Sequence, residues 1–273
     1  AAVTCALAIM CYAEFATAIP VAGSAYVFTY ATMGELIAWI IGWNLILELF
    51  TAAAVIAKYW GIYLSEVFAL IGWDIPPTIS LGPVDMTWGP FLIVALFTVL
   101  LVMGTKLSAR VGNIFTLIKI GVVLFVIVVG FFYIDFENYT PFIPDPVSTA
   151  SAGSEGVMAQ SLFSFMTGAA PAQYGVLGVF AGAAVVFFAF IGFDVVATSA
   201  EEVKNPGRTL PRGIFAGLAV VTALYIGVSL ALTGMVSYTE LASVEAPNLA
   251  TAFSLVGNTG AAQVIAIGSL IGL

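Results

Sequence analysis

The chain has 273 residues, of which 62% are hydrophobic and 8% are charged, with a formal net charge of −8. Soluble domains carry about 25% charged residues, so this composition predicts a protein whose surface meets lipid. The acidic balance argues against a nucleic-acid partner. The sequence has no histidine, the commonest metal ligand, and no nucleophile–base pair or phosphate-binding glycine loop, so we expect no enzyme, metal or cofactor. Two free thiols are expected at Cys5 and Cys11, which share one apolar run.

Seven continuous apolar segments predict an all-α polytopic membrane protein rather than a β-barrel. They form one transmembrane domain over residues 1–273 and cover about 1–19, 36–57, 89–104, 114–134, 176–200, 213–236 and 261–273. A spanning helix needs about 20 residues, so the third segment is short. Because the chain starts and stops inside apolar runs, we expect it to be an internal piece of a longer protein.

Two connections collect most of the basic residues. Lys106 and Arg110 lie in the loop expected at 105–113, and the loop expected at 201–213 holds three more, Lys204, Arg208 and Arg212. Loops rich in Lys and Arg stay in the cytoplasm, so both are expected on the inner face of the cell membrane. In the second loop, Pro206 and Pro211 are expected to stop the helix and fix the turn. Lys58, near the outer end of the second segment, does not follow this distribution.

Lys119 lies six residues into the fourth apolar segment, in the stretch FTLIKIGVVLF. An ionisable group inside a bilayer costs at least about 2.5–3.5 kcal/mol on insertion scales, so its presence needs a reason. One reading is a lysine whose ammonium reaches the interface along its own stem. The other is a lysine that faces the interior of the bundle and carries a proton.

Glu48 lies near the middle of the second segment, and Asn44 lies one helical turn earlier on the same face. Two polar residues on one stripe predict either a face that lines a cavity or a hydrogen-bonded pair that only joins helices.

Asp194 follows Gly192 inside the fifth segment, at the end of an apolar run that begins at Val186. The glycine is either a weak point in a regular helix or a place where the helix breaks. A break at membrane depth is tolerated where the backbone lines a cavity or touches a ligand, and broken helices are typical of secondary transporters.

Four stretches together resemble the amino acid–polyamine–organocation superfamily, in its cationic amino acid transporter-like branch. They are YAEFATAIPVAGSAYVFTYATMGELIAWIIGWNLILEL, RVGNIFTLIKIGVVLF, ENYTPFIP and VVFFAFIGFDVVATSAEEVKNPGRTLPRGI. The resemblance implies a leucine-transporter-type bundle of two inverted five-helix repeats. On that mapping, the chain holds the family's second to seventh helices and the start of the eighth, and is therefore partial.

The resemblance also implies site residues. The unwound part of the sixth helix, which binds the substrate, corresponds to Phe188, Ala189, Phe190, Ile191 and Gly192. Lys119 corresponds to a lysine that occupies the place of sodium in proton-coupled relatives. Glu48 corresponds to a glutamate near the site, whereas Asn44 stands where many relatives have Asp. The charged residues around the second basic loop are expected to form an inner gate or to act only as a topology signal, and they are Asp194, Glu201, Glu202, Lys204, Arg208 and Arg212.

These features predict a secondary active amino acid permease that works by alternating access, with the proton as coupling ion. The alternative is a membrane subunit of an energy-converting complex, in which Lys119 and Glu48 relay protons for partner subunits. A third reading is a fragment without activity of its own. The expected partners are an amino acid substrate and membrane lipid, and the sequence predicts neither the oligomeric state nor the particular amino acid.

Overall fold

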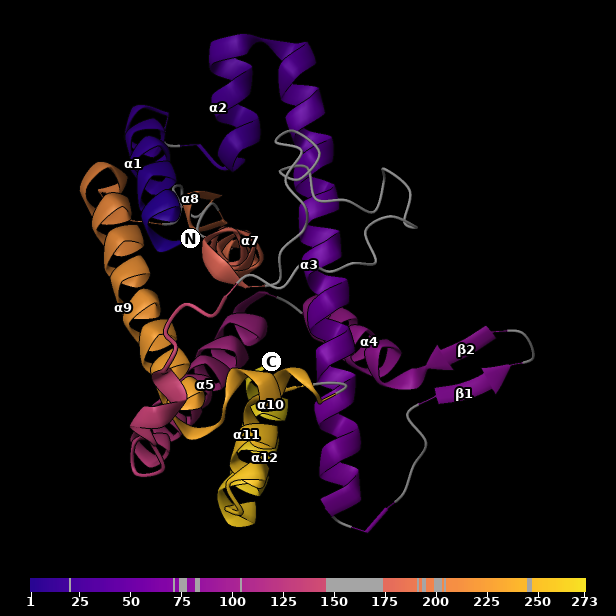
Figure 1. Ribbon diagram of the computed structural model, residues 1–273. Helices are drawn as coiled ribbons and strands as arrows, with labels where there is room; N and C mark the ends of the chain where they lie inside the picture. The colour runs from indigo at the N-terminus through magenta and orange to yellow at the C-terminus, as the bar shows by residue number, and fades with distance from the viewer. Residues whose placement is uncertain are drawn as a thin grey trace. The chain divides into compact units, whose positions relative to one another are not determined.

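The structure is a computed structural model that describes residues 1–19, 21–70, 72–73, 78–81, 84–103, 105–145, 174–190, 192, 195–198, 203, 205–244 and 247–273. The described chain is helical apart from one short hairpin (Figure 1). It divides into two compact units. Unit 1 comprises Ala1–Ala38 and Tyr139–Thr222, and unit 2 comprises Trp39–Asn138 and Ala223–Leu273.

Unit 1 contains α1 (Ala2–Ala18), α2 (Ser24–Met33), α7 (Gly175–Phe187), the 3₁₀ turn η4 (Phe188–Phe190), α8 (Val195–Thr198) and the first part of α9 (Pro206–Met235). Unit 2 contains most of α3 (Glu35–Leu70), β1 (Thr78–Leu81), β2 (Val84–Thr87), α4 (Trp88–Val102), α5 (Thr105–Phe131), the end of α9, α10 (Tyr238–Ala242), α11 (Leu249–Leu255) and α12 (Thr259–Gly272), with the 3₁₀ turn η1 (Phe136–Tyr139) at its boundary.

Three helices in the described part of the chain are long and apolar enough to cross a membrane, at Glu35–Ala69, Gly112–Phe131 and Arg208–Met235. Further apolar helices are shorter than a full span, which agrees with the short third segment expected from the sequence. Large apolar side chains point outward along the chain, and Leu36, Val102 and Phe132 are 73%, 83% and 81% exposed. Such a surface is stable in lipid, so the membrane-protein prediction is confirmed.

Both basic loops turn out to be partly helical. Residues 105–113 form the first turns of α5, and residues 206–213 form the first turns of α9, because Ala, Leu, Lys and Arg there are good helix formers. Pro206 takes the first helical position, where its missing N–H costs nothing. Pro211 lies inside α9 instead of in a turn, so the expectation that it ends the helix is wrong.

Several elements were not expected from the sequence. The second segment, expected at 36–57, continues as α3 to Leu70, since no Pro interrupts it and polar side chains are tolerated on a helix. The all-α expectation also misses an antiparallel hairpin in which Thr78 pairs with Thr87 and Leu81 with Val84. Its Thr, Ile and Val residues favour strands.

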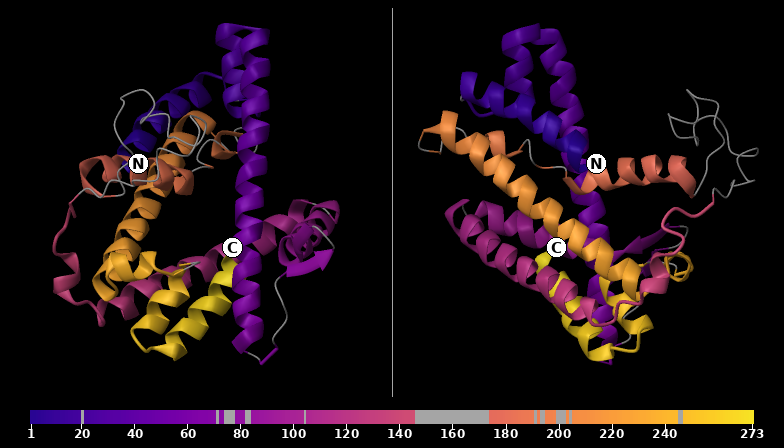
Figure 2. Two further views of the ribbon diagram at one scale, coloured as in Figure 1. Left: turned by 45° about the vertical axis from the view of Figure 1, so that its right-hand side comes forward. Right: turned by 60° about the vertical axis from the view of Figure 1, so that its left-hand side comes forward.

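Unit 2 has a core of its own, formed where α11 and α12 pack with each other and α12 packs along α5 (Figure 2). Phe253, Ile265 and Val126 are completely buried there. Asn248 and Asn258 cap α11 and α12, since their side-chain oxygens accept the N–H groups of Thr251 at 2.9 Å and Ala261 at 3.0 Å.

Unit 1 has a smaller buried cluster. Ala16 of α1, Phe28 of α2 and Leu210 of α9 are buried against one another. The ring of Phe28 stacks on Phe15 with centroids 5.4 Å apart and meets the edge of Tyr12 at 6.1 Å. These contacts fix α1 beside α2.

Glycines bring α3 and α4 close together, beside the stacked rings of Phe68 and Trp88. A Cβ added to Gly89 would lie 2.8 Å from the Cα of Gly61, so the two backbones touch directly. A Cβ on Gly61 would in turn lie 3.1 Å from the Cδ of Pro90. Small residues at a helix crossing allow this close approach, which is the usual way that helices pack in membranes.

We expect Gly89→Ala to lower the free energy of unfolding by about 1–3 kcal/mol, because the added methyl group must push the two helix backbones apart. The matched control is Gly121→Ala in α5, where an added Cβ meets nothing within 4 Å. There alanine should be neutral or stabilising by up to about 1 kcal/mol, as the better helix former. Thermal unfolding in detergent measures both variants, and an equal effect of the two would contradict the backbone contact.

Candidate functional site

The apolar segment at 176–200 does not form one continuous helix. The α-helix α7 ends at Phe187, the chain makes a 3₁₀ turn over 188–190, and a new helical turn, α8, begins at Val195. Between them, Gly192 has φ = +111°, a conformation that side-chain-bearing residues rarely adopt. The N–H of Val195 donates to the carbonyl oxygen of Gly192 at 3.2 Å. The interruption implied by the resemblance is therefore present.

The surroundings of this interruption come from the start of the chain. Helix α8 lies beside α1 and α2, as Figure 1 shows. Phe190 is buried, whereas Phe188 and Ala189 are exposed. Ile191 and Asp194 lie outside the described residues. Non-helical backbone at membrane depth is tolerated where it lines a cavity or contacts a ligand, so this turn is the first candidate site.

The expected inner gate is described only in part. Arg208 and Arg212 are exposed on the first turns of α9, and Asn205 precedes that helix with φ = +54°. The N–H groups of Arg208 and Thr209 donate to the carbonyl oxygen of Asn205 at 3.0 and 3.1 Å. The other expected members, Glu201, Glu202 and Lys204, lie outside the described residues, as does Asp194. The gate stays a prediction.

Lys119 lies deeper in its helix than the sequence suggests. Because α5 begins at Thr105 rather than near residue 114, Lys119 is about 21 Å along the axis from the first residue of the helix. Its side chain is exposed overall but lines two cavities in unit 2, of about 270 and 450 Å³.

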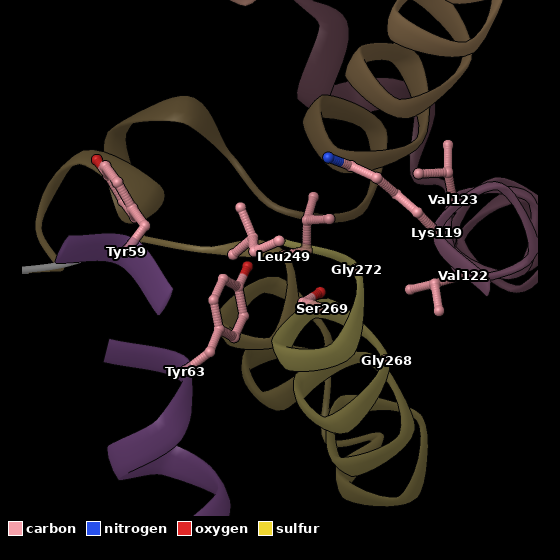
Figure 3. Close-up of a pocket in the computed structure, with 10 residues that line it drawn as sticks. Tyr59, Tyr63, Lys119, Val122, Val123, Leu249, Gly268, Ser269 and Gly272 are labelled. Carbon is pink, nitrogen blue, oxygen red and sulfur yellow. The ribbon is translucent and has the colours of Figure 1, made fainter. Parts of the chain in front are cut away.

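The smaller cavity joins three helices and the start of a fourth. Lys119, Val122 and Val123 of α5 face residues of α3, α11 and α12 (Figure 3), and those residues are Tyr59, Tyr63, Leu249, Gly268, Ser269, Gly272 and Leu273. Helix α12 approaches α5 closely, since a Cβ on Gly272 would lie 3.1 Å from the Cβ of Lys119. The larger cavity adds Thr116, Phe97 and Trp60, and the indole N–H of Trp60 donates to the carbonyl oxygen of Leu270 at 2.9 Å.

Tyr63 and Ser269 bring polar groups to this cavity, and neither was identified from the sequence. The Ser269 side chain and the Leu249 backbone both lie within hydrogen-bonding reach of the Tyr63 hydroxyl. A tyrosine and a serine are ordinary residues in apolar helices, so the sequence does not single them out as site residues. They are 206 positions apart in the chain, and only the packing of the helices brings them into contact.

Glu48 and Asn44 lie one turn apart on α3, as expected. Glu48 is half-buried and Asn44 is exposed. The described residues that line the two Lys119 cavities do not include either of them. The interrupted helix belongs to unit 1, whereas Lys119, Glu48 and Asn44 belong to unit 2. Their roles as substrate-binding or proton-coupling residues stay predictions.

A set of long apolar helices, together with a further apolar helix that is interrupted at a glycine, defines the class as a helical membrane protein. The sequence matches the family described as "Amino acid permease" over residues 1–273. The chain therefore belongs to the amino acid permease family, which is a family of transporters and not of enzymes. Membership implies the leucine-transporter-type fold that the resemblance led us to expect.

Several relatives align with the whole chain. It is 37% identical to the methylthioribose transporter and 39% identical to the branched-chain amino acid permease BcaP, both of Bacillus subtilis (strain 168), over 100% of this chain and 54% of each relative. It is 35% identical to cationic amino acid transporter 4 of Homo sapiens over 99% of this chain and 39% of the relative. The chain thus spans about half the length of these two bacterial relatives and less than half the length of the human relative.

Proposed function

We propose that this chain is the part of a secondary active amino acid transporter that carries the broken helix and the coupling lysine, and that the transporter works by alternating access. The observation that carries the proposal is the interruption between Phe187 and Val195, built around Gly192 at φ = +111°. Broken helices that present backbone groups near the middle of the membrane are how this class of transporter binds small zwitterions.

The substrate site then consists of the backbone of Phe188–Gly192, with Phe190 closing it. Carbonyl groups released from the regular helical pattern accept hydrogen bonds from an ammonium group of the substrate. Glu48 and Asn44, which lie one turn apart on α3, are also proposed to bind substrate.

Lys119 is proposed to couple transport to the proton. It lies deep in an apolar helix and lines cavities that also hold the hydroxyl-bearing residues Tyr63, Ser269 and Thr116. Loss and gain of a proton at its amine would favour different conformations.

The remaining expectations concern the membrane and the gate. The basic first turns of α5 and α9 face the cytoplasm in this proposal, which places the protein in the cell membrane. The charges around Arg208 and Arg212 would close the inner side in one conformation. Membership of a transporter family favours this function over a subunit of an energy-converting complex.

The substrate class is an amino acid. The relatives include proteins named for branched-chain and for cationic amino acids, and Glu48 favours a cationic side chain by charge.

The test uses the protein expressed from its complete coding sequence and reconstituted into liposomes. We expect radiolabelled leucine or arginine to accumulate when the outside is acidic by one pH unit, and not to accumulate without the gradient. One pH unit supplies about 1.4 kcal/mol per proton, which limits accumulation to about tenfold for one proton per substrate. No uptake of any proteinogenic amino acid, with or without a gradient, would refute the proposal.

A further inference from the structure

Two residues of α3 contact the first residues of α11. Glu66 accepts a hydrogen bond from the side-chain Nδ2 of Asn248 at 2.5 Å. Tyr63 lies one turn earlier on the same face of α3, with the Leu249 backbone within hydrogen-bonding reach of its hydroxyl. The N-cap residue and the first residue of α11 are therefore held by adjacent turns of α3.

Both polar atoms of the Asn248 side chain form hydrogen bonds. Its oxygen caps α11 by accepting the N–H of Thr251 at 2.9 Å, while its nitrogen donates to Glu66. These two bonds fix the orientation of the amide. They also tie the start of α11 to a residue 182 positions away in the chain.

The segment held in this way forms one wall of the smaller Lys119 cavity. Leu249 lines that cavity together with Tyr63 and Ser269, across from Lys119 and Val123 of α5 (Figure 3). Movement of the start of α11 away from α3 would withdraw Leu249 from the cavity. The contact between Glu66 and Asn248 is therefore placed to control how open the cavity is.

We propose that Glu66 and Asn248 are a positioning pair that latches the start of α11 against α3 and keeps the Lys119 cavity closed on that side. Breaking the bond lets Leu249 move outward and widens the cavity beside Val123. This role concerns access to the cavity and is measured without transport, so it stands or falls separately from the transport proposal.

The test measures access with a thiol. In the protein expressed from its complete coding sequence and freed of native cysteines, Val123→Cys places a thiol in the cavity wall, and its rate of reaction with a small water-soluble thiol reagent is measured. We expect Glu66→Ala to raise this rate about tenfold, which corresponds to about 1.4 kcal/mol in the opening equilibrium. Glu66→Gln should keep the parent rate, because its amide oxygen still accepts from Asn248.

The control for the helix itself is Ser65→Ala. Ser65 neighbours Glu66, but its hydroxyl donates to the carbonyl oxygen of Gly61 within α3, so the labelling rate should not change. Equal rates in Glu66→Ala and the parent would overturn the latch, as would a rise in Glu66→Gln equal to that in Glu66→Ala.

A second variant separates the latch from general loss of structure. Asn248→Asp keeps the cap of α11, since Asp caps helices as well as Asn does, but sets a second carboxyl group against Glu66. Two facing carboxyl groups can share one proton at low pH and repel each other when both are ionised. We expect labelling of Val123→Cys to be slow at pH 5 and about tenfold faster at pH 8 after correction for reagent chemistry.

The interpretation of this pH dependence rests on the ionisable groups of the elements around Glu66. The sequences of α11 and α12 contain no ionisable side chain, and α3 contributes Tyr63 on the same face, with Tyr59 one turn further. On α5, Lys119 faces the cavity. The unsubstituted Asn248 protein, measured over the same pH range, should show no such change. A corrected rate in Asn248→Asp that does not depend on pH would overturn the proposal.

Discussion

Lys119→Ala is expected to abolish accumulation of substrate by a pH gradient while leaving exchange of substrate across the membrane. In the proposed mechanism the coupling proton binds to and leaves the Lys119 amine, because the sequence of α5 has no other ionisable side chain after Arg110. With one proton per substrate, a gradient of one pH unit drives at most about tenfold accumulation, and the variant should fall to a ratio of about one. The measurement is uptake into proteoliposomes with and without the gradient, beside counterflow at equal pH.

Lys58→Ala is the matched control. Lys58 is also a lysine of a membrane-spanning helix, but it lines a separate cavity of about 70 Å³ with Trp88 and Gly89. Its removal should leave the accumulation ratio within about twofold of the parent. Undiminished accumulation by Lys119→Ala would remove the proton-coupling role from this residue. Loss of exchange as well would instead indicate that Lys119 is needed for the structure of the cavity.

Gly192→Ala is expected to lower the rate of uptake by about 5- to 150-fold, because it places a Cβ on a residue at φ = +111°. Backbone strain of this kind costs about 1–3 kcal/mol, and the chain relieves it by moving the turn that the substrate is proposed to contact. Since each 1.36 kcal/mol is tenfold in rate, a shift of this size is readily measured as the initial rate of uptake in proteoliposomes.

Gly182→Ala is the control. It tests whether the slower uptake of Gly192→Ala comes from the backbone geometry of the turn or simply from replacing a glycine of this segment by a larger residue. Gly182 lies in the preceding helix α7, where an added Cβ meets nothing within 4 Å. Alanine is a better helix former than glycine, so uptake should be unchanged and stability equal or greater. A full rate of uptake in Gly192→Ala would mean that the turn is not part of the substrate site.

The difference between these two glycines shows where sequence reasoning reaches its limit. Both stand in the same apolar segment, and periodicity alone treats each as a weak point in a helix. The family resemblance placed the interruption at Phe188–Gly192, and the structure confirms the break there. The general tendency of proline to end helices put Pro211 in a turn, although Pro211 lies inside α9.

Local composition was sufficient for the class of protein and the approximate apolar segments, because both depend on residues close together in the chain and on the solvent they face. It was not sufficient for the length of α3, the short helices α10 and α11 or the hairpin, since polar and β-branched residues outside the core of a span suit more than one local structure.

Contacts between distant residues were decided only by the tertiary structure. Asn248 with Glu66, and Ser269 with Tyr63, are ordinary residues in the sequence and become a latch and a cavity wall only when α11 and α12 pack against α3. Lys119 was recognisable because a charge in an apolar run is costly wherever the helix lies. A hydrogen bond between neutral or surface-type side chains leaves no such mark, because its energy exists only once packing has brought the two partners together.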